Sequence, residues 1–380
     1  MMNIHIGVLD SDPIRLITPI LDSHLKITKL ILFGKHNNKG LYERIKSLLE
    51  PKVMVCFLDL STSTNFFEFY ELHLFSILQL ENSSVFFNAS CGHRKYILPL
   101  YEFCVIHKIQ TYYIDEYSDD LIWINNPKKK HYQIADKINI PQFLHIFNLQ
   151  SLQSDSINFE DKYRGIKDIH QKWVKNAKYL APGFATLNYL ATTCRKTQSL
   201  TIELTPKQQG YKELSEILTD LSLFKLIDYE NGVLSFKNEE SRKYANGEWI
   251  ENFIFNIILD LKSQLSTIQD VCYNLEIHRN LNDRIIKNEL DIVVIVNNKL
   301  HIIECKTKDM RSGDDTLYKL ESLREFFGGI QSRAMLLSYR EVRNYDLSRA
   351  DDLNIKIIGP NDFHCIKKEI LSWFKEAGGH

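Results

Sequence analysis

Hydrophobic and polar positions follow two alternating patterns along the first 150 residues. Short apolar runs are separated by longer stretches in which apolar residues recur at helical spacing. The short runs are Ile4–Leu9, Lys29–Phe33, Val53–Leu58, Ser84–Phe87 and Gln110–Ile114, and the amphipathic stretches between them include Pro13–Leu25, Asn65–Leu80 and Lys95–His107. This alternation predicts a mostly parallel sheet covered by helices, a Rossmann-like α/β domain. Ligands of such domains gather at the carboxyl ends of the strands.

The C-terminal half contains a predicted hairpin. The β-branched run Ile292–Val296 and the segment Lys299–Lys306 flank an Asn-Asn pair. Asn tolerates the positive φ that a two-residue turn requires. With Asn297 and Asn298 as the turn, Val296 should face Lys299 across the two strands.

The same register opposes two carboxylates. Counting back from the turn places Asp291 opposite Glu304 and Glu289 opposite Lys306. Opposed residues have Cβ atoms about 4.5–5.5 Å apart, and like charges there are destabilising. A divalent metal ion would remove this repulsion, because hard cations take carboxylate oxygens. Lys306 beside it could orient a water molecule or stabilise developing charge. The simpler alternative is an edge hairpin with solvated charges.

Further elements flank this hairpin. A helix is predicted over Gly247–Lys262, because Trp249, Phe253, Ile257 and Leu261 form an apolar stripe. After the hairpin we expect a helix, two buried strands and a closing amphipathic helix, at Asp315–Phe327, Ala334–Leu337, Ile355–Ile358 and Asn361–Ala377. Together they predict a second α/β domain.

The segment between the two predicted domains reads differently. Ser151–Asp168 is polar and without clear periodicity, so we expect a linker there. A helix over Tyr211–Leu226 is followed by a hairpin around Asn231-Gly232, a strong turn signal. This module is either a winged helix or a support that packs onto the second domain. The helix before the hairpin is not strongly basic, which favours the support.

Composition narrows the class of protein. The chain has 380 residues, enough for two or three domains, and a net charge of -1, so nucleic-acid binding would have to come from a local patch. The seven cysteines are scattered without a CxxC pair, which predicts reduced thiols rather than disulfides or a zinc site. No signal peptide is recognisable, and no apolar run approaches the roughly 18 residues of a membrane span. We therefore expect a cytoplasmic protein.

Two loops at the predicted carboxyl ends of strands carry candidate ligand-binding residues. Asp10, Ser11 and Asp12 follow the first strand, where Asp12 can also simply cap a helix whose first position is Pro13. The loop after the fourth strand combines small, polar and basic residues, namely Asn88, Ser90, Cys91, Gly92, His93, Arg94 and Lys95. Such a loop before a helix can hold an anion, although a solvated loop has a similar composition.

Basic residues also occur near the end of the first domain. The stretch Leu121–Ile134 is expected to form a closing hairpin. We interpret its Lys128-Lys129-Lys130 run as a solvated turn rather than a binding patch.

The carboxylate pair and its lysine resemble the PD-(D/E)xK nuclease site, with Asp291 as the first acid and Glu304-Cys305-Lys306 as the (D/E)xK tripeptide. The sequence Gly247-x-Trp249-x-Glu251 is similar to the Gly-x-Trp-Leu-Glu pattern of proteins in which a nuclease is fused to a CARF domain, a cyclic-oligoadenylate sensor. This resemblance implies four catalytic residues, Asp291, Glu304, Lys306 and Glu251, and a Mn²⁺ or Mg²⁺ ion held by Asp291, Glu304 and Glu251. A surface glutamate is the alternative for Glu251.

The segment from Leu317 to Arg333 also resembles those fusions. It implies that Lys319 and Arg333 contact nucleic-acid phosphate, with a solvated helical face as the alternative.

The loop from Asn88 to Lys95 resembles the Asn-x-Thr-Gly-Gly-Thr-Lys loop of CARF domains, the cyclic-oligoadenylate sensors of type III CRISPR defence. Asn88, Ser90, Gly92 and Arg94 fit that pattern, whereas Cys91 replaces the first Gly and His93 the second Thr. Lys95 could supply the cation in place of Arg94.

These resemblances together imply a CARF–PD-(D/E)xK effector. Its parts would be a Rossmann-like CARF sensor at residues 1–150, a linker and helix-hairpin module at 151–245, and a restriction-endonuclease-like nuclease domain at 246–380. The family implies a homodimer that binds a cyclic oligoadenylate, most often cyclic tetra-adenylate, across its two-fold axis. The ligand would activate cleavage of DNA or RNA. The alternatives are a non-catalytic, ligand-controlled nucleic-acid-binding regulator and a constitutive nuclease.

Overall fold

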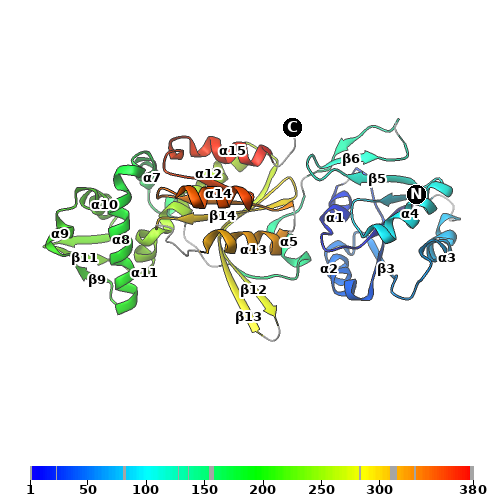
Figure 1. The fold of residues 1–380 in the computed structure, drawn as a ribbon, viewed down its shortest axis with the longest axis horizontal. Helices are drawn as coiled ribbons and strands as arrows, with labels where there is room; N and C mark the ends of the chain where they lie inside the picture. The colour runs from blue at the N-terminus through cyan, green and yellow to red at the C-terminus, as the bar shows by residue number, and fades with distance from the viewer. Residues whose placement is uncertain are drawn as a thin grey trace.

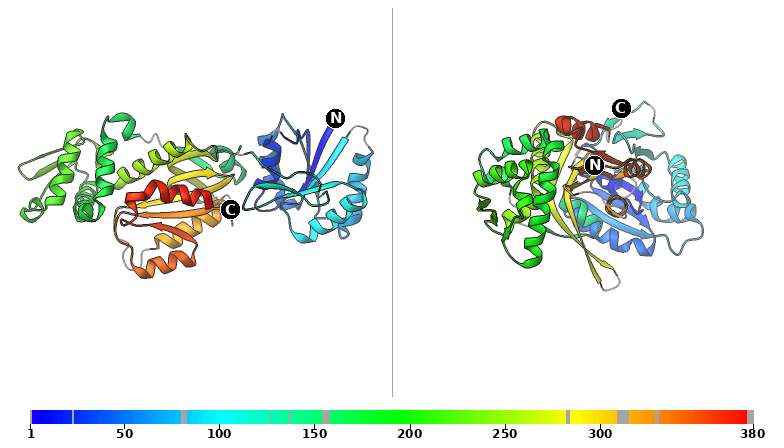
Figure 2. Two further views of the ribbon diagram at one scale, coloured as in Figure 1. Left: turned by 90° about the horizontal axis from the view of Figure 1, so that it is seen from above. Right: turned by 60° about the vertical axis from the view of Figure 1, so that its left-hand side comes forward.

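The computed structural model describes residues 2–22, 24–79, 83–126, 128–135, 137–153, 158–281, 284–308, 315–328 and 331–376. Figure 1 shows three parts in a row: an N-terminal sheet domain at one end, a second sheet domain in the middle and a smaller module at the other end. The view from above in Figure 2 keeps this order. The end of the second expected amphipathic stretch, Leu80, and the end of the closing helix, Ala377, lie outside the described residues.

The N-terminal sheet has the strand order β3-β2-β1-β4-β5-β6-β7. Pairs from β3 to β5 are parallel, whereas β6 and β7 add to the edge in antiparallel fashion. The strands are β1 (Met2–Val8), β2 (Lys29–Gly34), β3 (Met54–Asp59), β4 (Ser83–Asn88), β5 (Gln110–Ile114), β6 (Asp120–Trp123) and β7 (Tyr132–Gln133). The expected Rossmann-like sheet and its closing hairpin are confirmed.

Helices cover both faces of this sheet. Buried residues of α1 (Ile14–Leu21) and α2 (Lys39–Leu49) belong to one core, and those of α3 (Phe66–Leu78) and α4 (Arg94–Ile106) belong to another. A short 3-10 turn, His36–Asn38, precedes α2. The expected start of α1 needs a correction: Pro13 is the N-cap, and Asp12 accepts a hydrogen bond from the Ile14 N–H at 3.2 Å.

The closing hairpin contains one unexpected contact. Lys129 is half-buried, and its ammonium lies 3.3 Å from the centre of the Trp123 ring and 2.7 Å from the side-chain oxygen of Gln110. The expectation of a fully solvated lysine turn is therefore wrong for Lys129. Its neighbours Lys128 and Lys130 are exposed, as expected.

The second sheet has the order β16-β15-β14-β13-β12-β8. The neighbouring strands β8, β12, β13 and β14 pair in antiparallel fashion, and β14, β15 and β16 pair in parallel. The strands are β8 (Gln150–Gln153), β12 (Ile268–Leu281), β13 (Arg284–Val296), β14 (Lys299–Lys306), β15 (Arg333–Ser338) and β16 (Ile355–Ile358). Around them lie α5 (Ile140–Ile146), α12 (Trp249–Lys262), α13 (Thr316–Gly328), α14 (Asn344–Asp352), the 3-10 turn Phe363–Cys365 and α15 (Ile366–Glu376).

The centre of this sheet is buried on both faces. Ile292, Val294 and Val296 of β13 join the core under α12 and α15, whereas Val293 and Ile295 join the core under α5, α13 and α14. A strand covered on both faces reads as a continuous apolar run, which explains the lack of alternation in the sequence here.

The position of β8 corrects two expectations. Gln150–Gln153 pairs with the edge of β12, although it directly follows the N-terminal domain in sequence. Gln150, expected as the last residue of the first domain, therefore belongs to the second sheet. The stretch expected as a linker contains this strand, α6 (Phe159–Lys162) and the start of α7 (Ile166–Lys175), while residues 154–157 lie outside the described part.

The module at the far end has a three-stranded sheet of order β10-β11-β9. Its elements follow in the order α8 (Ala177–Thr197), β9 (Thr201–Glu203), α9 (Pro206–Gln209), α10 (Lys212–Leu223), β10 (Ile227–Glu230) and β11 (Val233–Phe236), after which α11 (Glu239–Lys243) leads back. This order is that of a winged helix. The module also shares a core with the second domain, because Phe184 of α8 stacks on Trp249 and contacts Tyr339 edge-on.

The seven cysteines are free thiols in the structure. Among the described helices, none combines the length and apolarity that crossing a membrane would require.

Candidate active site

The site is built on the β13–β14 hairpin. Asn297 and Asn298 both adopt positive φ, 48° and 56°, and Val296 pairs with Lys299. The predicted turn and register are thus confirmed from Val296 and Lys299 back to Ile292 and Ile303. Asp291 and Glu304 are the next residues on the two strands, and they are close enough for Glu304 to act on the charge of Asp291.

The two carboxylates have different partners. Asp291 accepts a hydrogen bond from the backbone N–H of Cys305 at 2.7 Å. Glu304 is 6% exposed, and one of its oxygens lies 2.7 Å from the Lys306 ammonium. Burial, which disfavours the ionised carboxylate, and repulsion from Glu304 together raise the pKa of Asp291 to about 8. The expected grouping of Asp291, Glu304 and Lys306 is therefore present.

A π-helical turn, Tyr244–Glu248, and α12 bring a further acid to the hairpin. Gly247 has φ 132°, and a Cβ there would lie 2.6 Å from the Thr307 hydroxyl, so only glycine fits against the end of β14. Trp249 is fully buried and anchors the helix in the core. Glu251, two residues on, lies in the first turn of α12. Each position of the Gly-x-Trp-x-Glu motif thus has a separate structural role.

Acidic groups from four elements, the π-helical turn, α12, β13 and β14, influence one another at this point. Burial, followed by repulsion from Asp291, Glu248 and Glu304, holds the pKa of Glu251 well above its usual range. Burial also raises the pKa of Glu248 to about 7, with the exposed Glu289 adding to the effect. Carboxyl groups that resist ionisation because they crowd together are typical of functional sites.

A cleft of about 330 Å³ opens beside these acids. Glu248, Glu251, Glu289, Cys305 and Lys306 line one part of it. Four further basic residues of the lining come from α8, α11 and the residues after β14, namely Arg195, Arg242, Lys243 and Lys308, and Glu239, Asn246, Gly247 and Thr307 complete it. Arg242 is buried and held by Glu239, whereas Arg195, Lys243 and Lys308 are exposed. Sequence reasoning missed these basic residues, because nothing local in the chain relates α8 or α11 to the hairpin.

The two residues expected to contact nucleic acid lie away from this cleft. Lys319 is exposed on α13 and does not line it. Arg333 pairs with His301, three residues before Glu304 on β14, and donates to the Trp373 carbonyl at 2.6 Å and to Glu376 at 3.0 Å. The structure thus ties Arg333 to α15 and places neither residue with the acids.

Among the described residues, no group of three or more His, Cys, Asp or Glu side chains is arranged to hold a metal ion. Asp291, Glu304 and Glu251, the trio expected to hold a metal ion, lie close enough for Asp291 and Glu304 to raise the pKa of Glu251 and for Glu304 to raise that of Asp291.

A second candidate site lies in the N-terminal domain, at the carboxyl ends of β1 and β2. A pocket of about 280 Å³ is lined by Asp10, His93 and Lys95, all expected from the sequence. It is also lined by Lys35, Asn37 and Asn38, which follow β2. The polar run after the apolar strand Lys29–Gly34 was the signal that could have identified this third loop.

The remaining loop residues act differently. Asn88 is buried, donates to the Arg15 carbonyl at 2.9 Å and accepts from the Ser90 N–H at 3.0 Å. Ser90 in turn accepts from the Ile114 N–H at 2.8 Å. Gly92 has φ 113° and packs directly on Val8. These residues shape the loop.

The other residues expected in the pocket do not line it. Cys91 is buried, and burial raises the pKa of its thiol to about 12. Arg94 is exposed outside the pocket, and Ser11 and Asp12 are not part of its lining either.

Comparison with known proteins agrees with this arrangement. Residues 238–377 match the family described as the Card1-like endonuclease domain. The crystal structure of protein VC1899 from Vibrio cholerae is 42% identical in sequence, covers 100% of both chains and superposes with a TM-score of 0.91. The chain belongs to the VC1899 family.

Two further solved structures share the fold of this chain. Can2 from Sulfobacillus thermosulfidooxidans, solved in complex with cyclic tetra-adenylate, has a TM-score of 0.79 and 18% identity over 98% of this chain and 99% of its own. A type III CRISPR defence DNA nuclease activated by cyclic oligoadenylate has a TM-score of 0.53 and 12% identity over 90% of this chain and 46% of its own. None of the curated protein sequences compared matches the chain. The resemblance to CARF-domain nucleases, and with it the fold class, is confirmed.

Proposed function

We propose that the chain is a metal-dependent endonuclease whose activity is switched on by a cyclic oligoadenylate. The observation that carries this proposal is the placement of Asp291, Glu304 and Lys306 on one hairpin, next to Glu251 and a cleft with basic walls. The match of residues 238–377 to a Card1-like endonuclease domain supports it.

The residues divide into three roles. Asp291 and Glu304, with Glu251 nearby, would hold Mn²⁺ or Mg²⁺, since carboxylate oxygens suit hard cations and a cation would relieve the repulsion that raises their pKa values. Such an ion supplies an activated water and Lewis-acid stabilisation of the phosphate. Lys306, whose ammonium lies 2.7 Å from Glu304, would stabilise negative charge on a phosphodiester. Arg195, Lys243 and Lys308 would hold the nucleic-acid backbone through their charges.

The N-terminal pocket is the proposed activator site. Asp10, Lys35, Asn37, Asn38, His93 and Lys95 combine cations, amides and a helix start, which suit a phosphate-rich ring. Can2, of the same fold, was solved with cyclic tetra-adenylate, and we propose the same class of ligand here. A homodimer, in which each protomer offers the same loops to a symmetric ring, would complete the site.

A nuclease assay that crosses three variables tests this function: added Mn²⁺ or Mg²⁺, the ring size of the cyclic oligoadenylate, and DNA or RNA in single- or double-stranded form. We expect cleavage only with both metal and ligand. Cleavage without any cyclic oligoadenylate would indicate a constitutive nuclease.

One observation favours a second candidate function. The module formed by α8 to β11 has the element order of a winged helix, a common nucleic-acid-binding unit. A non-catalytic regulator would bind nucleic acid under ligand control and leave it intact at every metal concentration, so the same assay separates the two.

A further inference from the structure

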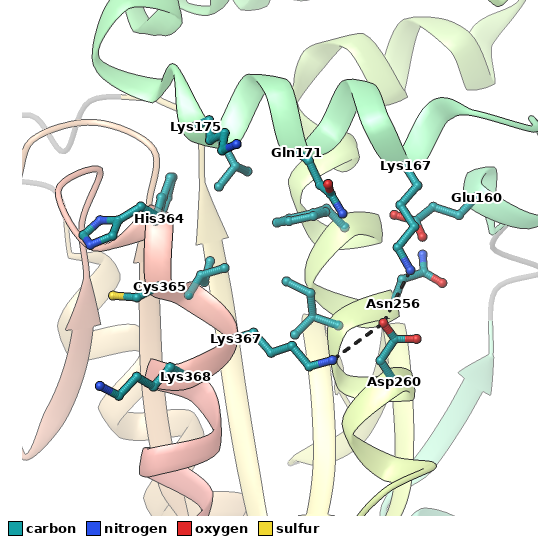
Figure 3. A pocket seen from close by; sticks show the side chains of 15 residues that line it. Glu160, Lys167, Gln171, Lys175, Asn256, Asp260, His364, Cys365, Lys367 and Lys368 are labelled. Carbon is teal, nitrogen blue, oxygen red and sulfur yellow. Dashed lines mark hydrogen bonds and ion pairs between the residues drawn. The ribbon is translucent and has the colours of Figure 1, made fainter.

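A well-formed pocket lies on the side of α12 away from the acids. It has a volume of about 490 Å³, within the range of roughly 300–1,000 Å³ typical of small-molecule sites. Three regions that are distant in sequence form it: α6 with α7, α12, and the 3-10 turn with the start of α15 (Figure 3). Because an α-helix turns once in 3.6 residues, Phe253 and Asp260 lie about half a turn around α12 from Glu251.

The chemistry of the pocket combines an apolar floor with a cationic opening. Phe253, Ile257, Phe363, Ile366 and Val174 are almost fully buried and form the floor. Four lysines surround it, namely Lys167, Lys175, Lys367 and Lys368.

The charges inside the pocket are not balanced. Asp260 is approached by two ammonium groups, Lys167 at 3.4 Å and Lys367 at 3.9 Å, and Figure 3 shows both side chains reaching toward it. One carboxylate cannot neutralise two ammonium groups. The other acid of the pocket, Glu160, accepts a hydrogen bond at 3.0 Å from His170, an imidazole whose pKa burial lowers, so Glu160 keeps its negative charge and two carboxylates face four lysines. The pocket therefore keeps an excess of positive charge that a bound anion would balance.

We propose that this pocket binds a nucleoside phosphate. Its phosphate takes the place between Lys167 and Lys367, where lysines act as point charges for phosphate. The base lies against the apolar floor that Phe253, Ile257 and Phe363 help to form. Gln171 is exposed at the pocket wall, and its amide can both donate to and accept from a base edge.

This proposal goes beyond the proposed function, and its test needs neither nuclease activity nor the activator. Binding is measured by calorimetry on the full chain in a chelator, so that no cleavage occurs. The probes are adenosine monophosphate, inorganic phosphate and a short single-stranded oligonucleotide. Comparing adenosine monophosphate with the oligonucleotide shows whether the bound nucleoside phosphate is a free nucleotide or part of a nucleic-acid strand.

Four variants make the test specific. Lys167→Ala combined with Lys367→Ala should weaken adenosine monophosphate binding by at least about tenfold, because two charge-assisted contacts are lost. Lys375→Ala is the matched control, since Lys375 is an exposed lysine of the same α15 that does not line the pocket. Asp260→Asn should tighten binding, because it removes the carboxylate that competes with phosphate for both lysines. Gln171→Ala should weaken binding of the nucleotide and leave that of inorganic phosphate unchanged.

These variants should fold, because the ion pairs of Asp260 are about half exposed and exposed pairs contribute little to stability. If the oligonucleotide binds with this lysine dependence and adenosine monophosphate does not, the ligand is still a nucleoside phosphate, but one that belongs to a nucleic-acid strand. The proposal is overturned if the double lysine variant binds like the wild type, if no nucleotide probe binds, or if inorganic phosphate binds as tightly as adenosine monophosphate.

Discussion

The side-chain amide of Asn298 donates a hydrogen bond to the buried carboxylate of Asp119 at 3.2 Å. Asn298 lies at the turn of the β13–β14 hairpin, whose other end carries Asp291 and Glu304, and Asp119 directly precedes β6 of the N-terminal domain. The neighbouring Lys299 ammonium donates to the Tyr117 carbonyl at 2.9 Å. The N-terminal domain therefore holds the tip of the strand pair that bears the acids, and a movement of β6 would be passed directly to that pair.

The buried Asp119 gives a testable pH dependence. Burial raises its pKa from 3.8 to about 6, against the opposing effects of Lys299, Asn298 and Arg15, with Asp115 adding slightly to the rise. Since the folded state then binds more protons than the unfolded state between about pH 4 and pH 6, this group's contribution to stability falls as pH rises through that window. The isosteric change Asp119→Asn removes the titration. Relative to wild type, the variant should gain unfolding free energy from pH 4 to pH 6, by up to roughly 3 kcal/mol. Denaturant unfolding at both pH values measures it, and a constant difference would contradict the burial argument.

The catalytic assignment predicts that Asp291→Ala or Glu304→Ala abolishes cleavage. The first change removes the carboxylate that accepts from the Cys305 N–H, and the second removes the carboxylate paired with Lys306. Affinity for cyclic oligoadenylate should not change, because that pocket lies in another domain. Asp352→Ala, at an exposed carboxylate of α14, is the control. Near-normal cleavage by either active-site variant in Mn²⁺ or Mg²⁺ would refute the assignment.

The activator pocket predicts different effects for two adjacent basic residues. Lys95 lines the pocket and Arg94 does not. Lys95→Ala should weaken cyclic oligoadenylate binding by about tenfold, the effect expected from one charge-assisted contact, whereas Arg94→Ala should change it little. Activity at saturating ligand should be preserved, since only the occupancy of the active state shifts. Titration of nuclease activity against ligand measures both. A midpoint that moves with Arg94 and not with Lys95 would place the ligand elsewhere.

The basic residues of the cleft predict different effects for another two residues that are adjacent in sequence. Arg195 lines the cleft and its neighbour Lys196 on α8 does not. Arg195→Ala should raise KM for nucleic acid and make binding less sensitive to salt, because one fewer counterion is released per complex. Lys196→Ala should leave both unchanged. KM measured at two salt concentrations gives the comparison, and equal salt dependence in all three proteins would exclude Arg195 from the substrate path.

Local chemistry made much of the site predictable. The Asn297-Asn298 turn fixes the register, and the strand period of two then determines which residues oppose each other, so Asp291 and Glu304 could be paired without coordinates. The spacing of Gly247, Trp249 and Glu251 is likewise a property of one short segment.

Long-range packing explains what the sequence did not reveal. Arg195 and Lys308 meet only because α8 packs against the π-helical turn and the end of β14, and Asn188 of α8 hydrogen-bonds to the Thr307 hydroxyl at 3.1 Å. Arg333 is a residue type that often contacts phosphate, but here it donates to the carbonyl of Trp373 on α15, 40 residues further along the chain. Its role depends on which helix covers the sheet, and no local pattern encodes that.

The pairing of β8 with β12 has a practical consequence for dividing the protein. The match to an endonuclease domain begins at residue 238, yet the edge of that domain's sheet is supplied by Gln150–Gln153, from the other side of the helical module. A fragment starting at residue 238 would leave the long strand β12 with an unpaired row of backbone amides and carbonyls. Open strand edges of this kind recruit other chains and lead to aggregation. The smallest soluble nuclease fragment is therefore expected to begin ahead of β8 and to retain the whole module that follows it.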